Sequence, residues 1–141
     1  MLSQGKSWNL LRDITADQFL IMMSQLGRPE EITLVGVFDK FGRGSRQDVA
    51  LPLHHDGDYS ARKAAEKGLP FDKKIDIVGL YCIKGGETAT QIESDGVVSE
   101  IVLKAGEALV FDNRKCRHGR TGSVGDRLLL RVWLERYSDA G

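Results

Sequence analysis

The chain of 141 residues has no long hydrophobic segment, no excess of charge of one sign and few cysteines. No apolar run approaches the roughly 20 residues that a helix needs to cross a bilayer, so we expect no membrane partner. Twenty basic and 20 acidic side chains give a formal net charge of zero. This balance provides no electrostatic attraction for nucleic acid or for a membrane surface, and we expect neither as a partner.

The first residues and the cysteines favour a cytoplasmic protein. Residues 1–10 lack a basic segment followed by an apolar one, so we expect no secretory signal. The two cysteines, Cys82 and Cys116, stand far apart and form no Cys-x-x-Cys motif. We therefore expect reduced thiols in a cytoplasmic setting. The length is typical of one domain, residues 1–141, which can bury about two-thirds of its unfolded surface.

Helical signals occur in two places. Thr15 and Gln18 have the spacing of a capping box, and Gly27 and Pro29 would end the helix. Apolar side chains recur at helical spacing between these limits, at Phe19, Met22, Met23 and Leu26, and we interpret the two methionines as core packing. Residues 59–68 have the composition of a short surface helix near the site.

Most of the remaining chain is predicted to form short strands. The β-branched and apolar runs that indicate strands lie at 32–38, 50–54, 75–83, 88–93, 97–103, 108–111 and 127–137. Turn residues separate these runs, and the glycine- and arginine-containing stretch 41–48 is predicted to be a loop. Several short strands with regular turn signals predict a sandwich or a barrel.

A candidate metal site lies at the end of the predicted strand 50–54. His54 and Asp56 are two residues apart and share one face of an extended chain, while His55 points the other way. His118 is the only histidine outside this stretch. Two histidines and a carboxylate form the facial triad of non-haem iron sites. Asp58 would replace Asp56 only if the segment were not extended, and the alternative is that all of them are loop residues.

Five segments, spread over about the last 90 residues, resemble those of Fe(II)- and 2-oxoglutarate-dependent dioxygenases of the taurine dioxygenase and clavaminate synthase type. The segments are 53–57 (Leu-His-His-Asp-Gly), 85–88 (Gly-Gly-Glu-Thr), 106–114, 118–120 (His-Gly-Arg) and 126–131. The resemblance implies a mainly β fold with a few helices, a double-stranded β-helix (jelly-roll, cupin-like barrel). It also implies that His54, Asp56 and His118 hold Fe(II), and that 2-oxoglutarate and O2 occupy the free metal positions.

The resemblance also implies roles for polar residues near the metal. The last predicted strand places Arg127, Arg131 and Trp133 on one face and aliphatic side chains on the other. By resemblance, Arg127 binds the far carboxylate of 2-oxoglutarate, with help from Thr88, and Arg131 binds an acidic group of the prime substrate; the two arginines could exchange roles. Arg120 either lines the co-substrate site or forms an internal ion pair.

The implied reaction is hydroxylation of an unactivated C–H bond in a small, anionic substrate, with release of succinate and CO2. The sequence does not identify this substrate, nor does it separate hydroxylation from desaturation. Only about 60 residues separate Asp56 from His118, where larger members carry a long lid, so a second copy of the chain could cover the site. Two alternatives stay open: a cupin that binds another metal through His54, His55 and His118, and a non-catalytic jelly-roll binding module.

Overall fold

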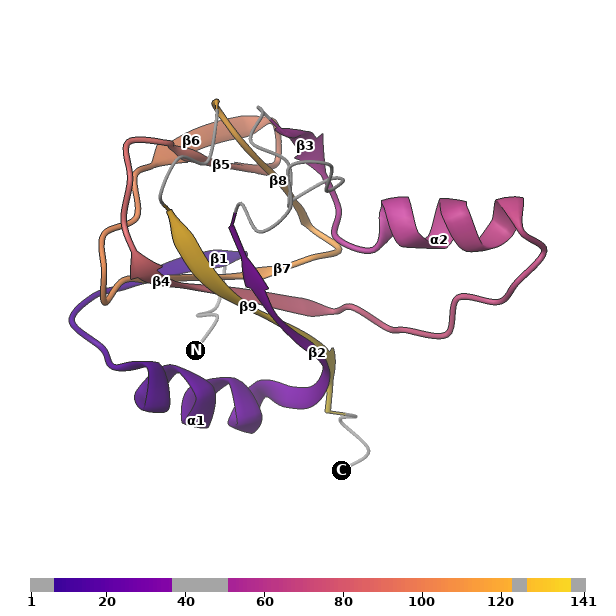
Figure 1. Ribbon diagram of the computed structural model, residues 1–141, viewed down its shortest axis with the longest axis horizontal. Helices are drawn as coiled ribbons and strands as arrows, with labels where there is room; N and C mark the ends of the chain where they lie inside the picture. The colour runs from indigo at the N-terminus through magenta and orange to yellow at the C-terminus, as the bar shows by residue number, and fades with distance from the viewer. Residues whose placement is uncertain (1–6, 37–50, 123–126, 138–141) are drawn as a thin grey trace.

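Two antiparallel sheets form the body of the protein in a computed structural model that describes residues 7–36, 51–122 and 127–137. The larger sheet has the strand order β1 (Trp8–Leu11), β7 (Ala108–Asp112), β4 (Ile77–Lys84), β9 (Leu128–Arg136), β2 (Gly27–Val35). The smaller sheet has the order β3 (Leu51–His54), β8 (Cys116–Arg120), β5 (Thr90–Ser94), β6 (Val97–Ile101). Figure 1 shows the smaller sheet above the larger one.

The chain passes back and forth between the two sheets. β2, β4, β7 and β9 belong to the larger sheet, and β3, β5, β6 and β8 belong to the smaller one. From β2 onward, consecutive strands therefore lie in opposite sheets, except for the hairpin of β5 and β6. This is the winding of a double-stranded β-helix, so the expected jelly-roll fold is confirmed.

Two apolar clusters hold the layers together. Side chains from both sheets form the cluster between them, which includes Val78, Leu80, Ile92, Leu109, Phe111, Leu129 and Trp133. The second cluster lies on the outer face of the larger sheet, where helix α1 (Ala16–Leu26) buries Phe19 and Met23. Gly79 allows this close packing, because a Cβ there would lie 2.6 Å from the Met23 methyl group. Side chains on the two faces of β9 therefore pack into different clusters: Leu129 and Trp133 into the first, and Val132 and Leu134 into the second.

Helix α1 begins as the sequence predicts. The Thr15 hydroxyl accepts a hydrogen bond from the Gln18 backbone N–H at 3.1 Å, and the Gln18 side chain accepts one from the Thr15 N–H at 2.9 Å. The helix ends at Gly27, but the chain continues directly into β2, five residues before the predicted strand start. Pro29 is tolerated because β2 is an edge strand with an irregular register at this proline.

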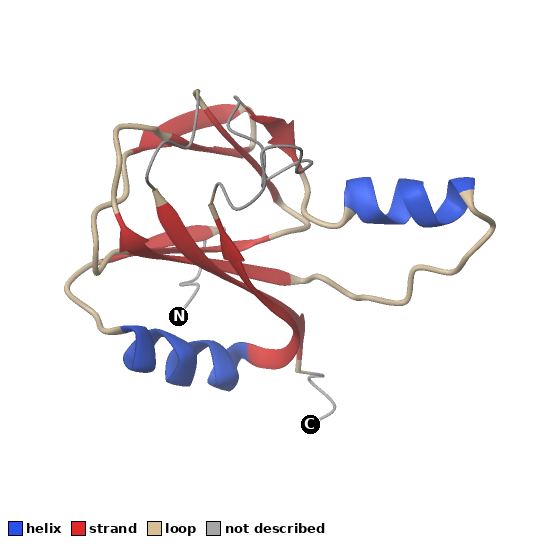
Figure 2. Cartoon of the chain, viewed as in Figure 1, coloured by secondary structure: helices blue, strands red, loops and turns tan. Residues whose placement is uncertain are grey.

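Two strands escaped prediction, and both are stabilised by their neighbours rather than by their composition. β1 pairs with β7 along its whole length. β8 has the polar sequence Cys-Arg-His-Gly-Arg and lies between β3 and β5. The predicted loop 41–48 lies outside the described residues. Helix α2 (Asp58–Glu66) matches the predicted surface helix, and Figure 2 shows both helices outside the pair of sheets.

Both cysteines are buried and free, as expected from their spacing. Neither helix in the described ranges has the length and apolar character needed to span a membrane.

Candidate metal centre

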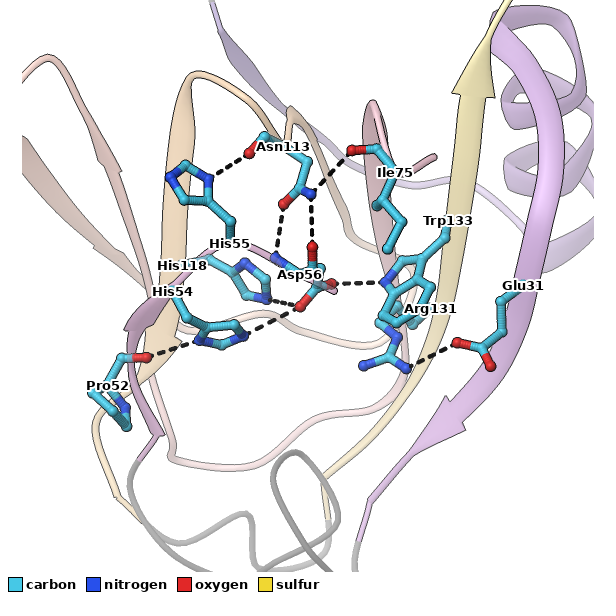
Figure 3. A network of polar contacts seen from close by, with 10 residues as sticks. All are labelled: Glu31, Pro52, His54, His55, Asp56, Ile75, Asn113, His118, Arg131 and Trp133. Atoms are coloured by element: carbon cyan, nitrogen blue, oxygen red, sulfur yellow. Dashed lines mark hydrogen bonds and ion pairs between the residues drawn. The ribbon is translucent and has the colours of Figure 1, made fainter. Parts of the chain in front are cut away.

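Strands β3 and β8 bring the two histidines of the predicted triad together. The two strands are antiparallel neighbours, and their register pairs His54 with His118. The imidazole centroids lie 4.4 Å apart. Asp56 follows β3 by two residues, and its Oδ1 lies 3.2 Å from His54 Nε2 and 3.3 Å from His118 Nε2 (Figure 3). Among the described residues, these three form the cluster of side chains able to hold a metal ion.

The geometry of these three atoms suits a divalent metal ion. Ligand atoms about 2.1 Å from a metal and at right angles to each other lie about 3 Å apart. The observed separations of 3.2 and 3.3 Å between the nitrogens and Asp56 Oδ1 are close to that value. Two imidazole nitrogens and one carboxylate oxygen on one face would leave the opposite face of an octahedral ion open. The two separations from Asp56 therefore fit the expected facial triad, and all three ligand atoms lie within 4.8 Å of one another.

Neighbouring groups orient two of the three side chains. His54 Nδ1 lies 2.8 Å from the Pro52 carbonyl oxygen, to which it donates, so its Nε2 is left to act as a ligand. The Trp133 indole N–H donates to Asp56 Oδ2 at 2.8 Å, which leaves Oδ1 directed at the histidines. The His118 ring packs on Phe111 at 4.8 Å. Its Nδ1 is buried and has no hydrogen-bond partner in the described part of the chain.

The electrostatics keep Asp56 ionised. Burial alone would raise the pKa of Asp56, but His118, His54 and Arg131 together hold it well below its ordinary value. Burial would lower the pKa of His54, but its bonds to Asp56 and to the Pro52 carbonyl raise it above the ordinary value. The metal-free site thus favours the ionised Asp56 carboxylate and makes the His54 ring hold its proton to higher pH than an isolated imidazole. A metal ion would replace that proton with a larger positive charge.

The structure separates the triad from the neighbouring residues that were considered as ligands. The His55 ring points to the backbone carbonyl of Asn113 and does not join the metal cluster. The three-histidine set of a cupin is therefore not assembled. Asp58 is exposed and begins helix α2. Asn113 and Arg114 lie in the turn that leads into β8.

The triad lines one pocket between the sheets, together with other side chains from β4, β5, β8 and β9. The pocket has about 380 Å³ of empty space, including its opening to solvent. Its lining residues are Val35, His54, Asp56, Leu80, Thr90, His118, Gly119, Arg120, Arg127, Leu129 and Arg131. The Arg127 and Arg131 face of β9 therefore faces the interior of the barrel. Arg120 also lines the pocket.

Arg127 is a buried cation in this pocket, with 4% of its surface exposed. Its Nη1 donates to the Thr90 hydroxyl at 2.8 Å, and its Nε is buried and has no hydrogen-bond partner among the residues that the structure describes. In the described ranges, no carboxylate forms an ion pair with it. Burial lowers the pKa of the Arg127 guanidinium, and Cys82 offsets part of this effect. A buried guanidinium of this kind is suited to an anionic ligand.

The threonine beside Arg127 is not the one that the sequence suggested. Thr88 lies before β5 and is not among the residues that line the pocket, whereas Thr90 is buried within β5 and contacts Arg127. The structure therefore places Thr90 next to Arg127, while the role expected for Thr88 stays a prediction. The two residues are two apart and look alike in sequence, so only the strand pairing of β5 distinguishes them.

Arg131 occupies the part of the pocket closer to the triad. Its guanidinium lies 4.4 Å from the Trp133 ring centroid, and its Nη2 lies 3.5 Å from Glu31 Oε2. Glu31 also forms an ion pair with Lys73 at 3.2 Å. Trp133 was placed on the arginine face by its spacing, but its bond to Asp56 was not foreseen.

Comparisons with known proteins add little to these observations. No protein-family model matches the chain, and no curated protein sequence matches it. Among solved structures, the crystal structure of a prolyl-4-hydroxylase from Pseudomonas putida is similar to this chain. The two share 13% sequence identity over 94% of each chain, with a TM-score of 0.49. A likeness at this level does not bear on function, which has to be inferred from the site itself.

Proposed function

We propose that this protein is an Fe(II)- and 2-oxoglutarate-dependent oxygenase that hydroxylates an unactivated C–H bond of a small, anionic substrate. One observation supports this most: the His54, Asp56 and His118 ligand atoms converge in the same pocket as the buried cation of Arg127. A metal with open positions and a fixed cation nearby suit a co-substrate that chelates the metal at one end and carries a carboxylate at the other.

Fe(II) in this site would supply the redox chemistry, in which O2 and 2-oxoglutarate give succinate, CO2 and one hydroxyl group on the substrate. The two imidazoles and Asp56 Oδ1 would hold the metal on one face. The Trp133 N–H would keep Asp56 Oδ2 engaged at 2.8 Å, so that the carboxylate offers one oxygen and not two. The remaining face stays accessible to the pocket.

Arg127 and Thr90 would bind the far carboxylate of 2-oxoglutarate. The unpartnered Nε and the Nη groups of Arg127 offer a planar set of donors that matches a carboxylate. The Thr90 hydroxyl, 2.8 Å from Arg127 Nη1, adds a further donor at the same point. The apolar side chains of Leu80 and Leu129 line the pocket nearby and exclude water, which strengthens these interactions.

Arg131 would contact the anionic group of the prime substrate. Residues four apart on a strand are about 13 Å apart along the chain. Arg127 and Arg131 therefore cannot both bind one small co-substrate equally. Arg131 is the nearer of the two to Asp56, whose pKa it lowers, and the Trp133 ring supports its guanidinium. Glu31 shares this cation at 3.5 Å, so an incoming anion would compete with a weak ion pair.

The test is release of succinate from 2-oxoglutarate with Fe(II), ascorbate and a panel of small carboxylates and sulfonates. We expect turnover that requires Fe(II), that is lost in Asp56→Ala, and that a suitable panel member stimulates. His55→Gln is the matched control, because it changes the adjacent imidazole outside the metal cluster. Turnover that persists in Asp56→Ala, or its complete absence with every metal, would overturn the proposal and favour a binding module.

A further inference from the structure

The side chain of Asn113 is hydrogen-bonded to both main-chain polar groups of Asp56. Asn113 lies in the turn between β7 and β8 and is 5% exposed. Its Oδ1 accepts a hydrogen bond from the Asp56 N–H at 2.9 Å, and its Nδ2 donates to the Asp56 carbonyl oxygen at 3.0 Å (Figure 3). The same Nδ2 donates to the Ile75 carbonyl oxygen at 3.0 Å. The carboxamide thus makes three bonds and is well satisfied.

The backbone of Asn113 fixes the carboxamide in place. Its N–H donates to the Asp76 carbonyl oxygen at 2.9 Å, and its carbonyl oxygen accepts a bond from the His55 ring. Asn113 therefore joins the segment before β4, the turn before β8 and two consecutive residues of the segment after β3. All of these bonds are buried or half-buried, where they are stronger than in water.

Asp56 needs such a support more than the two histidines do. β3 ends at His54, and its pairing with β8 sets the positions of His54 and His118 directly. Asp56 lies beyond the strand and is followed by Gly57, whose φ of 93° turns the chain toward α2. In the described part of the chain, no strand pairing reaches Asp56. Its backbone is instead held by Asn113, and its carboxylate by Trp133 and the histidines.

We propose that Asn113 is a positioning residue of the metal centre, which fixes Asp56 relative to the two histidines and thereby favours metals that require a carboxylate ligand. This inference rests on the metal site of the proposed function. Carboxylate oxygens matter most for hard ions such as Mn(II), whereas imidazoles suffice for much of the affinity of Ni(II). Loosening Asp56 alone should therefore weaken Mn(II) binding more than Ni(II) binding.

The experiment measures the dissociation constants of Mn(II) and Ni(II) for the wild-type protein, Asn113→Ala, Asp56→Ala and Thr15→Ala. Residues that support metal ligands typically contribute ten- to hundredfold to affinity. We expect Asn113→Ala to lose about that factor in Mn(II) affinity and a several-fold smaller factor in Ni(II) affinity. Asp56→Ala should likewise weaken Mn(II) binding more than Ni(II) binding. Thr15→Ala removes the cap of the distant helix α1 and serves as a destabilised control with both affinities unchanged.

The outcomes separate the two proposals. If Asn113→Ala binds Mn(II) like the wild type, or loses Mn(II) and Ni(II) affinity by the same factor, Asn113 is structural only and the inference is wrong. If Asn113→Ala cannot be purified in folded form, Asn113→Ser takes its place, because the serine hydroxyl can replace one of the bonds to Asp56. The same comparison then applies: the loss of Mn(II) affinity should exceed the loss of Ni(II) affinity. If the wild-type protein binds neither ion, the metal centre itself, and with it the proposed function, is refuted.

Discussion

Replacing Arg127 by methionine should stabilise the metal-free protein. Arg127 is 4% exposed. Within residues 7–36, 51–122 and 127–137, its side chain makes one hydrogen bond, to Thr90, and its buried Nε has no partner. An unsatisfied buried polar group costs about 1–3 kcal/mol, and more if it is charged. Methionine removes that cost and fills a similar volume, but the Thr90 hydroxyl loses its partner, at about 1 kcal/mol. We therefore expect a gain of up to about 2 kcal/mol in the free energy of unfolding.

The same substitution should nearly abolish co-substrate binding. Removing one half of a buried ion pair costs about 3–5 kcal/mol. Because each 1.4 kcal/mol is tenfold in affinity, the dissociation constant of 2-oxoglutarate should rise by roughly two to three and a half orders of magnitude. A variant that gains stability and loses a ligand is the pattern expected of a binding residue whose charge is uncompensated without its ligand.

Two measurements check this prediction. Urea unfolding of the metal-free protein gives the change in stability, and titration of 2-oxoglutarate into the anaerobic Fe(II) form gives the change in affinity. Arg117→Met is the matched control, because Arg117 is exposed and pairs with Glu93 at the surface. It should change stability by less than about 0.5 kcal/mol. An Arg127→Met protein that is less stable and binds 2-oxoglutarate normally would show that Arg127 has a structural role.

Three further predictions follow from the site and its supports. The pKa of His54 is higher in the folded, metal-free protein than in the unfolded chain, where it is about 6.5. Protonated His54 therefore adds to the free energy of unfolding below pH about 6.5, and this contribution is lost as the pH rises through the folded pKa. Mn(II) needs the neutral ring and should bind more weakly as the pH falls through the same range; an affinity independent of pH would contradict a His54 ligand. His55→Gln should keep most of the Mn(II) affinity, and a loss as large as that of Asp56→Ala would restore the three-histidine alternative. Gly79→Ala should lower the free energy of unfolding by about 1–3 kcal/mol, because its Cβ would meet the Met23 side chain; an unchanged urea midpoint would show that α1 can shift freely.

Local patterns in the sequence predicted those features that depend on near neighbours. The capping box of Thr15 and Gln18 formed as expected because it requires only four consecutive residues. The two-residue period of β9 correctly placed Arg127 and Arg131 on the pocket face. Apart from β2, which begins five residues earlier than predicted, the strands with apolar composition were located within a few residues of their observed limits.

Features that depend on distant pairing were missed. β8 is too polar to be predicted as a strand, and it forms because β3 and β5 supply hydrogen-bonding partners on both sides. The bonds that hold Asp56 come from Asn113 and Trp133, which lie 57 and 77 residues away along the chain. No periodicity in a single sequence encodes such contacts. The choice between Thr88 and Thr90 likewise depends on the register of β5, which only the assembled sheet defines.

The most direct test of the metal centre is the visible absorption of the protein under anaerobic conditions with Fe(II) and 2-oxoglutarate. A co-substrate that chelates iron held by His54, Asp56 and His118 should give a weak charge-transfer band. The band should be present in the wild-type protein and in His55→Gln, and absent in His118→Ala, while far-ultraviolet circular dichroism shows that each variant is folded. A band of full strength in folded His118→Ala would contradict the assignment of the triad.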